Sequence, residues 1–236
     1  GLIKKTALSE FNSIRKSGKI AISLLPGDEL ISVQVSNGND EILVASHAGK
    51  CIRFSETDVR ATGRDTTGVR AMMIDEDDAV VDMTVVKDGY DVLTLSEHGF
   101  GKRSDIEDYR LQSRGGKGIK AGVFNEKTGN LACLKLVKDD EDIMIIADNG
   151  IIIRTAATGI SKIGRDTKGV TIMKLGDAIV KSVAVVPHAE EEPEGEETAD
   201  GEKIVDGVEG VETAENTAAE TVDSASTETT DSGDEE

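Results

Sequence analysis

The sequence predicts an all-β fold, built as a propeller-like array of four-stranded units. A repeat of about fifty residues runs through most of the chain, and short apolar runs rich in β-branched residues fill each repeat. No long stretch with helical periodicity competes with these runs. Because each four-stranded unit would bury a face against the next unit, the repetition itself predicts the core.

Each repeat is marked by a turn glycine between two apolar runs. The sequence reads DEILVASHAGKCIRF at 40–54, YDVLTLSEHGFGKRS at 90–104 and EDIMIIADNGIIIRT at 141–155, and a copy without its first strand opens the chain as GLIKKT. A base follows each glycine after four residues, and an apolar residue follows after ten. The turn glycines are Gly1, Gly49, Gly99 and Gly150, the bases are Lys5, Arg53, Arg103 and Arg154, and the apolar residues are Phe11, Val59, Tyr109 and Ile160.

A second glycine follows in each repeat, and two further apolar runs separated by an acidic turn come after it. Their short length and β-branched content favour strands, so each full unit has about four. We expect an opening part-unit and three fuller units in residues 1–187. The second glycines are Gly18, Gly68, Gly118 and Gly169, and the residues in register in the later runs are Ile31, Val81, Cys133 and Val180.

The loops before three of the second glycines are cationic. They read GRDTTGV, SRGGKGI and GRDTKGV, with an arginine four residues before the glycine at Arg64, Arg114 and Arg165. Equivalent loops of a closed array lie at similar height on its outer surface, so recurring bases there predict a belt. Glycines let backbone amides approach an anion, and the arginine fork suits phosphate. Taken singly, each base is also explained as solvated surface charge.

The acidity of the chain lies almost entirely in its last 49 residues. Residues 188–236 hold 19 acidic side chains and one base, Lys203, whereas residues 1–187 have a net charge of −1. A segment with so little apolar area cannot offset its ordering entropy, so we expect a disordered acidic tail. The near-neutral body is then able to carry a basic face. One hypothesis is that the tail competes with a ligand for that face, and the alternative is a solubilising tail.

Other features narrow the class of protein. Cys51 and Cys133 fall in apolar runs and are expected as buried thiols in a reducing compartment. No apolar run approaches the length that spans a bilayer, and no leader is recognised, so we expect a cytoplasmic protein. The three histidines show neither metal-ligand spacing nor a triad, and DEDD at 75–78 lacks a calcium-loop pattern.

Residues 1–187 resemble the C-terminal domain of the DNA gyrase A subunit. The resemblance is carried by GLIKKTALSEFNSIRKSGKIAISLLPGDELISV, KCIRFSETDVRATGRDTTGVRAM, YDVLTLSEHGFGKRSDIEDY and GRDTKGVTIMKL, and the tail is similar to the acidic extension of many gyrase A subunits. It implies a β-pinwheel, a propeller variant that exchanges strands between neighbouring blades. Family pinwheels usually have about six blades, so the array is expected to be incomplete and N-terminally truncated.

The resemblance also implies wrapping of duplex DNA around a basic rim, within a bacterial, nucleoid-associated enzyme that introduces negative supercoils at the expense of ATP. Gln112 to Gly118 match the family's Gln-Arg-Arg-Gly-Gly-Lys/Arg-Gly box except at Ser113. The match lies in the third unit rather than the first blade, so we expect it to contact DNA without being the decisive wrapping element.

The predicted interface is sequence-independent and phosphate-directed, with no metal or cofactor. The cleavage tyrosine, ATP and magnesium are expected elsewhere in the intact enzyme, which also contains the B subunit together with the rest of the A subunit. Neither Tyr90 nor Tyr109 has the residues around it that would make it catalytic. The predicted DNA-binding residues are Lys4, Lys5, Arg53, Arg64, Lys102, Arg103, Gln112, Arg114, Gly115, Gly116, Lys117, Gly118, Arg154, Arg165 and Lys168.

Two alternatives remain open. The topoisomerase IV A subunit has a related C-terminal domain. The box-like loop, the amino-acid sequence of the repeats and the acidic tail favour gyrase. A protein-binding β-propeller would use the same repeats without nucleic acid. Trp is absent, and aromatic residues for a binding hot spot are few. Binding to unrelated duplexes would separate this alternative from the DNA-binding prediction.

Overall fold

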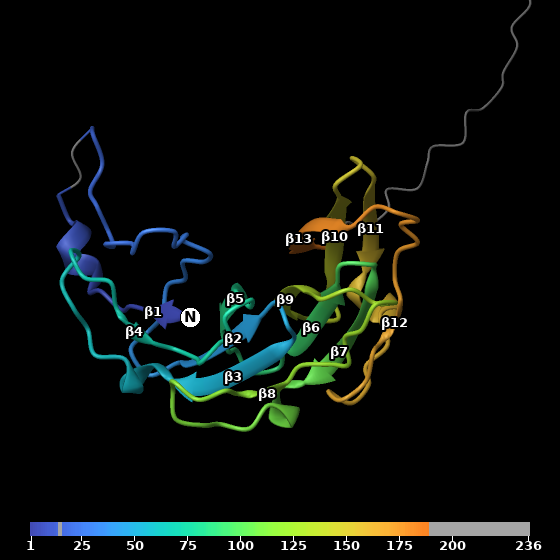
Figure 1. Cartoon of the computed structure of the whole chain (residues 1–236), viewed down its shortest axis with the longest axis horizontal. Coiled ribbons are helices and arrows are strands. Elements are labelled where there is room, and N and C mark those ends of the chain that lie inside the picture. The colour runs from blue at the N-terminus through green and yellow to red at the C-terminus, as the bar shows by residue number, and fades with distance from the viewer. Residues whose placement is uncertain (14–15, 189–236) are drawn as a thin grey trace, which may run out of the picture. The chain divides into compact units, whose positions relative to one another are not determined.

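The computed structural model describes residues 1–13 and 16–188, and the predicted acidic tail, apart from His188, lies outside the described residues. These residues form an all-β unit of consecutive antiparallel sheets, with only single 3₁₀ turns as helix (Figure 1). The predicted fold class is therefore confirmed.

The first complete sheet is built on the hairpin that follows Asp40. Strands β2 and β3 pair across the turn at Gly49, and β5 pairs with the other edge of β2. A two-residue strand from the next repeat, β8, completes the sheet in the order β5-β2-β3-β8. The elements are β2 (Glu41–Ser46), β3 (Lys50–Ser55), the 3₁₀ turn η2 (Glu56–Asp58), β5 (Val80–Val85) and β8 (Ile119–Lys120).

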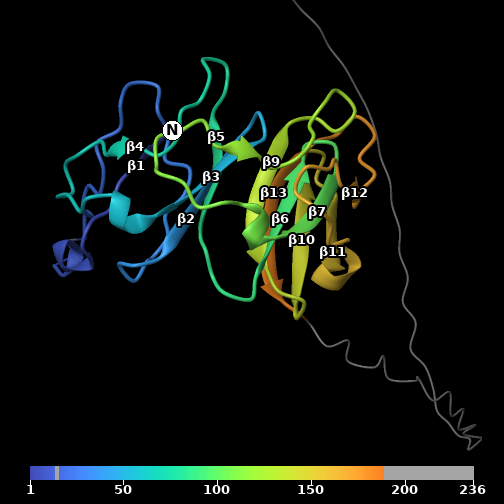
Figure 2. The ribbon, with the colours of Figure 1, turned by 90° about the horizontal axis from the view of Figure 1, so that it is seen from below.

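The second complete sheet repeats this plan in the order β12-β7-β6-β9. The last sheet has three strands, in the order β11-β10-β13. Figure 2 shows these two sheets beside each other, and β9 contacts β13 between them. The elements are β6 (Asp91–Ser96), β7 (Phe100–Asp105), η3 (Ile106–Asp108), β9 (Leu131–Val137), β10 (Glu141–Ala147), β11 (Ile152–Ala156), η4 (Ala157–Gly159), β12 (Val170–Thr171) and β13 (Val180–Pro187).

Neighbouring sheets are linked by strand exchange. The short strand after each second glycine crosses to the sheet of the preceding repeat, so β8 pairs with β3 and β12 pairs with β7. The same pairing joins β4 (Val69–Arg70) to β1 (Leu2–Ile3). Strands β5, β9 and β13 lie toward the inside of the array in Figure 1, and β8 and β12 lie on its outer side. This exchange is the feature that distinguishes a β-pinwheel from a simple propeller.

The second glycines are required by this exchange. Gly118 has φ of +71°, and a Cβ on it would overlap the backbone oxygen of Cys51. Gly68 and Gly169 have the same positive φ and the same close approach to Ile3 and Gly101. A side chain at any of these positions would strain the backbone and push the loop off the strand of the preceding repeat.

The opening unit departs from the prediction. It contains β1 and the 3₁₀ turn η1 (Leu8–Phe11), but no strand is formed between residues 16 and 40. In the next repeat the corresponding segment is β5, which pairs with the hairpin strand β2. No described strand occupies that place beside residues 30–35, so Leu30, Val33 and Val35 remain exposed.

Three buried clusters form the core: one lies along the β2 sheet, one lies between the β2 and β6 sheets, and one lies between the β6 and β10 sheets. Cys51 and Cys133 are buried free thiols, and burial raises the pKa of each to about 12, so the prediction of buried thiols is confirmed. Tyr109 fills its apolar repeat position and is fully buried. No helix in the described residues is long and apolar enough to cross a membrane.

Candidate nucleic-acid interface

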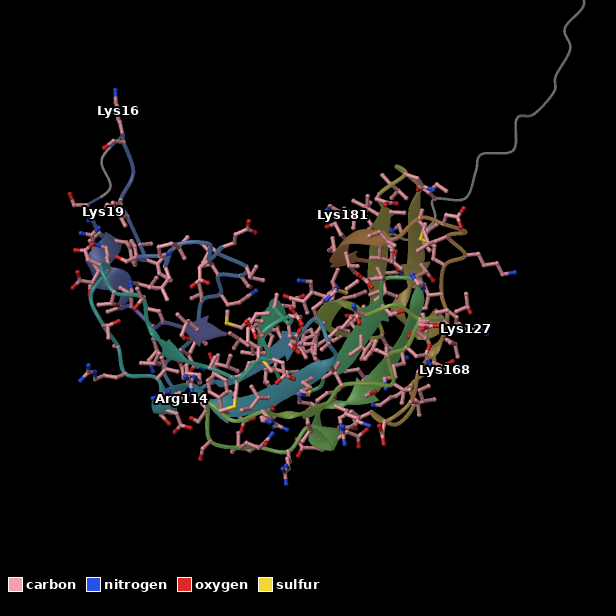
Figure 3. The ribbon with its side chains drawn as sticks, viewed as in Figure 1. Lys16, Lys19, Arg114, Lys127, Lys168 and Lys181 are labelled. Carbon is pink, nitrogen blue, oxygen red and sulfur yellow. The ribbon has the colours of Figure 1, made fainter. Side chains whose placement is uncertain are left out.

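The three arginine-bearing loops occupy equivalent places in consecutive repeats. Figure 3 shows Arg114 and Lys168 on the outer side of the sheets, whereas Lys181 lies on the inner side with β13. Lys117 and Lys168, each directly before a second glycine, have exposed side chains. The repeat therefore brings the loops to one side, as predicted from their register.

The loop arginines fasten each loop to the preceding repeat. Arg114 Nε donates to the Asp58 carbonyl at 2.9 Å, and its Nη1 donates to the Arg70 carbonyl at 2.9 Å. Arg165 repeats this, with Nε 3.0 Å from the Asp108 carbonyl and Nη1 bonded to the Lys120 carbonyl. Both side chains are half-buried and neither forms a salt bridge with the described acids. Backbone carbonyls therefore fix each arginine in position, and part of each guanidinium remains at the surface.

Arg64 occupies the corresponding place in the repeat that follows the opening part-unit. Its Nη1 donates to the Ile20 carbonyl at 2.8 Å, the residue that corresponds to Arg70 and Lys120. The arginine position is thus structurally equivalent in all three loops.

The box-like loop is divided between structural and exposed residues. Gly115 has φ of +83°, and its amide donates to the Ala71 carbonyl at 2.6 Å. Gly116 and Lys117 are exposed. Gln112 instead turns inward, and its Nε2 is buried with no hydrogen-bond partner among the described atoms. The groups of this loop that are accessible to a ligand are therefore Lys117 and the backbone around Gly116, whereas the Gln112 amide is not accessible.

The bases that follow the turn glycines are engaged in ion pairs. Arg53 Nε bonds Glu41 at 2.5 Å, Arg154 Nε bonds Asp142 at 2.7 Å, and Arg103 lies 3.4 Å from Asp91. Lys5 lies 3.6 Å from Glu56, which is buried. The side chains of Arg53 and Arg103 are only 11% and 8% exposed, so little of either guanidinium is accessible to a phosphate.

The lysines one residue earlier are also turned inward. Lys102 is 2% exposed, and its Nζ bonds the Arg165 carbonyl and lies 2.8 Å from the Thr167 carbonyl. Lys4 is half-buried and donates to the carbonyls of Ala21 and Arg64. Both lysines therefore support loops from within, and the burial of Lys102 leaves little of its side chain accessible to a phosphate.

Exposed bases that sequence reasoning missed lie next to the loops. Arg60 and Arg110 each follow a turn glycine by eleven residues, and Arg70 and Lys120 each follow a second glycine by two. All four are exposed and form no salt bridge within residues 1–13 and 16–188. Recurrence at these two offsets is the signal that would have identified them. They lie beside Arg114 and Arg165, whose guanidinium groups bond the carbonyls of Arg70 and Lys120.

The chemistry of this side of the sheets is electrostatic. Recurring cations, fixed arginines and glycine-rich backbone are suited to phosphate oxygens, and no recognition helix is present among the described elements. The described residues contain no group of three or more His, Cys, Asp or Glu arranged to hold a metal ion.

Comparison with known sequences identifies the repeat. The family model described as DNA gyrase C-terminal domain, beta-propeller, matches residues 1–37, 40–87, 90–132 and 141–187. The DNA gyrase A subunit of Staphylococcus epidermidis (strain ATCC 12228 / FDA PCI 1200) is 41% identical over 194 residues, and that of Staphylococcus aureus (strain MRSA252) is 42% identical over 195. These alignments cover 81% of this chain but 22% of each relative, so the chain spans about a fifth of their length.

Solved structures agree with the fold. The structure of the DNA gyrase A C-terminal domain matches with a TM-score of 0.68 and 28% identity, covering 72% of this chain and 59% of that one. The crystal structure of the C-terminal domain of DNA topoisomerase IV matches with a TM-score of 0.75 and 20% identity, covering 79% and 59% of the two chains. At that identity the second match concerns the fold alone.

Proposed function

The chain belongs to the DNA gyrase C-terminal domain family, and we propose from this membership that it binds duplex DNA through phosphates and bends it along the outer side of its sheets. The observation that carries the proposal is the equivalent placement of Arg64, Arg114 and Arg165, each in a loop beside exposed, unpaired bases. Sequence-independent wrapping needs charge along a path rather than a recognition helix.

In the longer protein to which the relatives correspond, we propose that this wrapping serves DNA gyrase. The A subunit would act with the B subunit in the bacterial cytoplasm, on nucleoid DNA. Wrapping would present a second DNA segment to the cleavage gate, so that strand passage introduces negative supercoils. Cleavage, ATP hydrolysis and the magnesium that they need would belong to other parts of that enzyme.

A linking-number assay tests the wrapping directly. The chain is added to relaxed plasmid in the presence of a nicking-closing enzyme, and the plasmid topoisomers are then separated after deproteinisation. Wrapping in one sense shifts the topoisomer distribution in proportion to the protein bound. An unshifted distribution under conditions where the protein is bound would reject wrapping, and absence of binding to any duplex would reject the proposed function.

A salt titration tests the phosphate contacts. If about six phosphates are neutralised, the slope of log affinity against log salt concentration is about −5. A variant with Lys117→Glu, Lys120→Glu and Lys168→Glu should bind far more weakly, with a shallower slope. Lys181→Glu on the inner side is the control for adding negative charge, and it should leave the slope nearly unchanged. Equal loss in both variants would contradict an interface on the outer side.

A further inference from the structure

The three arginine loops differ at coupled positions. Counting back from the second glycine, the third, second and first residues are Asp, Thr and Thr in the first loop, Gly, Gly and Lys in the middle loop, and Asp, Thr and Lys in the last. The residue three positions after each turn glycine contacts the arginine loop of the following repeat, and it differs in the same way. It is Lys4 for the first loop, Ile52 for the middle loop and Lys102 for the last loop.

The ammonium group of Lys102 donates to several backbone carbonyls of the last loop. Lys102 Nζ lies 3.3 Å from the Gly164 carbonyl and 2.8 Å from the Thr167 carbonyl, and it also bonds the Arg165 carbonyl. Thr167 Oγ1 closes the same loop by donating to the Gly164 carbonyl at 2.9 Å. The ammonium and the hydroxyl together fix the loop backbone.

The first loop has the same construction. Lys4 Nζ bonds the Arg64 carbonyl, and Thr66 Oγ1 donates to the Gly63 carbonyl at 3.2 Å. A lysine beneath the loop and a threonine within it therefore occur together in the first and last loops.

The middle loop has neither anchor. Ile52 is fully buried, and its Cδ1 would lie 3.6 Å from a Cβ placed on Gly116, so an apolar tip lies beneath the loop in place of an ammonium. Gly116 replaces the threonine, and Gly115 adopts a positive φ. The loop backbone is therefore held by fewer side-chain bonds than its two counterparts.

The charge of the loops follows the same division. Asp65 and Asp166 are exposed next to the loop arginines, whereas the middle loop carries Arg114 and Lys117 with no acidic residue. The loops with an anchoring lysine are thus the ones in which an acid offsets the arginine. The middle loop therefore combines the fewest side-chain anchors with two cationic residues and no acid, although its Gly115 amide still donates to the Ala71 carbonyl.

We infer that Lys4, Ile52 and Lys102 are positioning residues that decide how far each loop adapts to a DNA phosphate. Lysine fixes its loop and makes it a weak, pre-set contact. Isoleucine leaves the middle loop without a side-chain anchor beneath it, so Lys117 and the backbone amides that follow Gly115 adapt to a phosphate. The inference rests on the proposed function for its ligand, but the anchoring itself is measurable without DNA.

Two reciprocal variants test the anchoring. Lys102→Met with Thr167→Gly removes both anchors from the last loop, and Ile52→Lys with Gly116→Thr introduces both into the middle loop. Neither changes the exposed charge. Amide hydrogen exchange of the folded proteins without DNA should become about tenfold faster at residues 164–168 in the first variant and slower at 113–118 in the second. Ile52→Met is the control, because it replaces the side chain without adding an ammonium.

Acylation of lysine amines with and without duplex then measures each contact by mass spectrometry. In the wild-type chain, DNA should protect Lys117 more than Lys168. Protection should shift toward Lys168 when the last loop is released and away from Lys117 when the middle loop is anchored.

The outcomes separate the inference from the proposed function. Unchanged hydrogen exchange in both variants would overturn the positioning role whether or not DNA binds. Changed exchange with unchanged lysine protection would overturn the link between anchoring and phosphate contact. If the wild-type chain bound no duplex, the proposed function would fail, and the adaptation to phosphate inferred from it would fail with it. If Lys102→Met with Thr167→Gly did not fold, Lys102→Arg would replace it, and exchange that stayed as slow as in the wild type would support anchoring by a buried cation.

Discussion

Two sets of bases recur with the same period, yet the structure uses them in opposite ways. The strand bases are Lys5, Arg53, Arg103 and Arg154, and each pairs with a carboxylate. The loop bases are Arg64, Arg114 and Arg165, and each donates instead to backbone carbonyls of the preceding repeat. Recurrence in sequence predicts which bases are structurally equivalent, but it does not predict whether their partners are carboxylates or backbone carbonyls.

The largest expected effect on stability comes from removing a strand base that forms ion pairs. Arg103→Met should lower the free energy of unfolding by about 3 kcal/mol, because Arg103 is buried and bonds Asp91, Asp139 and the Ile160 carbonyl. Arg114→Met, which removes a half-exposed loop base, should cost about 1 kcal/mol. Denaturant unfolding of both variants measures the difference. Equal losses would show that burial does not distinguish the two sets.

A smaller loss of folding stability is expected from a substitution at Gly118, where the loop approaches strand β3 of the preceding repeat. Gly118→Ala should destabilise the fold by about 2 kcal/mol, because its positive φ and the nearby Cys51 carbonyl both disfavour a Cβ. Gly164→Ala is the matched control, since no atom lies within 4 Å of its Cβ position. Thermal unfolding should shift for Gly118→Ala alone, and an equal shift in the control would refute the close-approach argument.

Each exposed base without a carboxylate partner should make its own contribution to the salt dependence of DNA binding. Arg110→Ala should reduce the magnitude of the salt slope by about 1, the change expected for one phosphate contact. Lys50→Ala is the comparison, because Lys50 already lies 3.2 Å from Asp75. Fluorescence anisotropy of a labelled duplex at several salt concentrations measures both. A larger change for Lys50→Ala would contradict the distinction between paired and unpaired bases.

The smallest expected effect is the pH dependence of the stability that the ion pair of Asp142 with Arg154 contributes. Hydrogen bonding from His188, followed by Arg154, lowers the pKa of Asp142 below its usual value. Because the folded-state pKa is depressed, the stabilisation from Asp142 is present above the pKa of the unfolded chain and is lost as pH falls through the folded-state value. The stability difference between wild type and Asp142→Asn should therefore shrink as the pH falls below about 4.

Much of the fold could be predicted because glycine spacing, apolar runs and β-branched content are local features of the sequence. The hairpins around Gly49, Gly99 and Gly150 and the buried place of Tyr109 followed from them. The strand expected near Ile31 does not form, because a strand needs a partner as well as a suitable sequence.

The candidate interface was harder to predict, because exposure depends on packing between repeats. The pairing of Arg53 with Glu41 nevertheless left a signal, since an acid stands twelve residues before Arg53, Arg103 and Arg154. That offset places the two side chains on one face of the hairpin. No such pattern marks Lys102, whose burial depends on contacts with residues more than sixty positions away.

The strand exchange of β8 and β12 also bears on how such arrays change in evolution. A repeat in the sequence begins in one sheet and delivers a strand to the sheet before it, so the unit of gene duplication is offset from the unit of structure. An inserted copy would give its short strand to the preceding sheet and receive one from the repeat that follows. Blade number could therefore grow or shrink by whole repeats without leaving an unpaired strand edge inside the array.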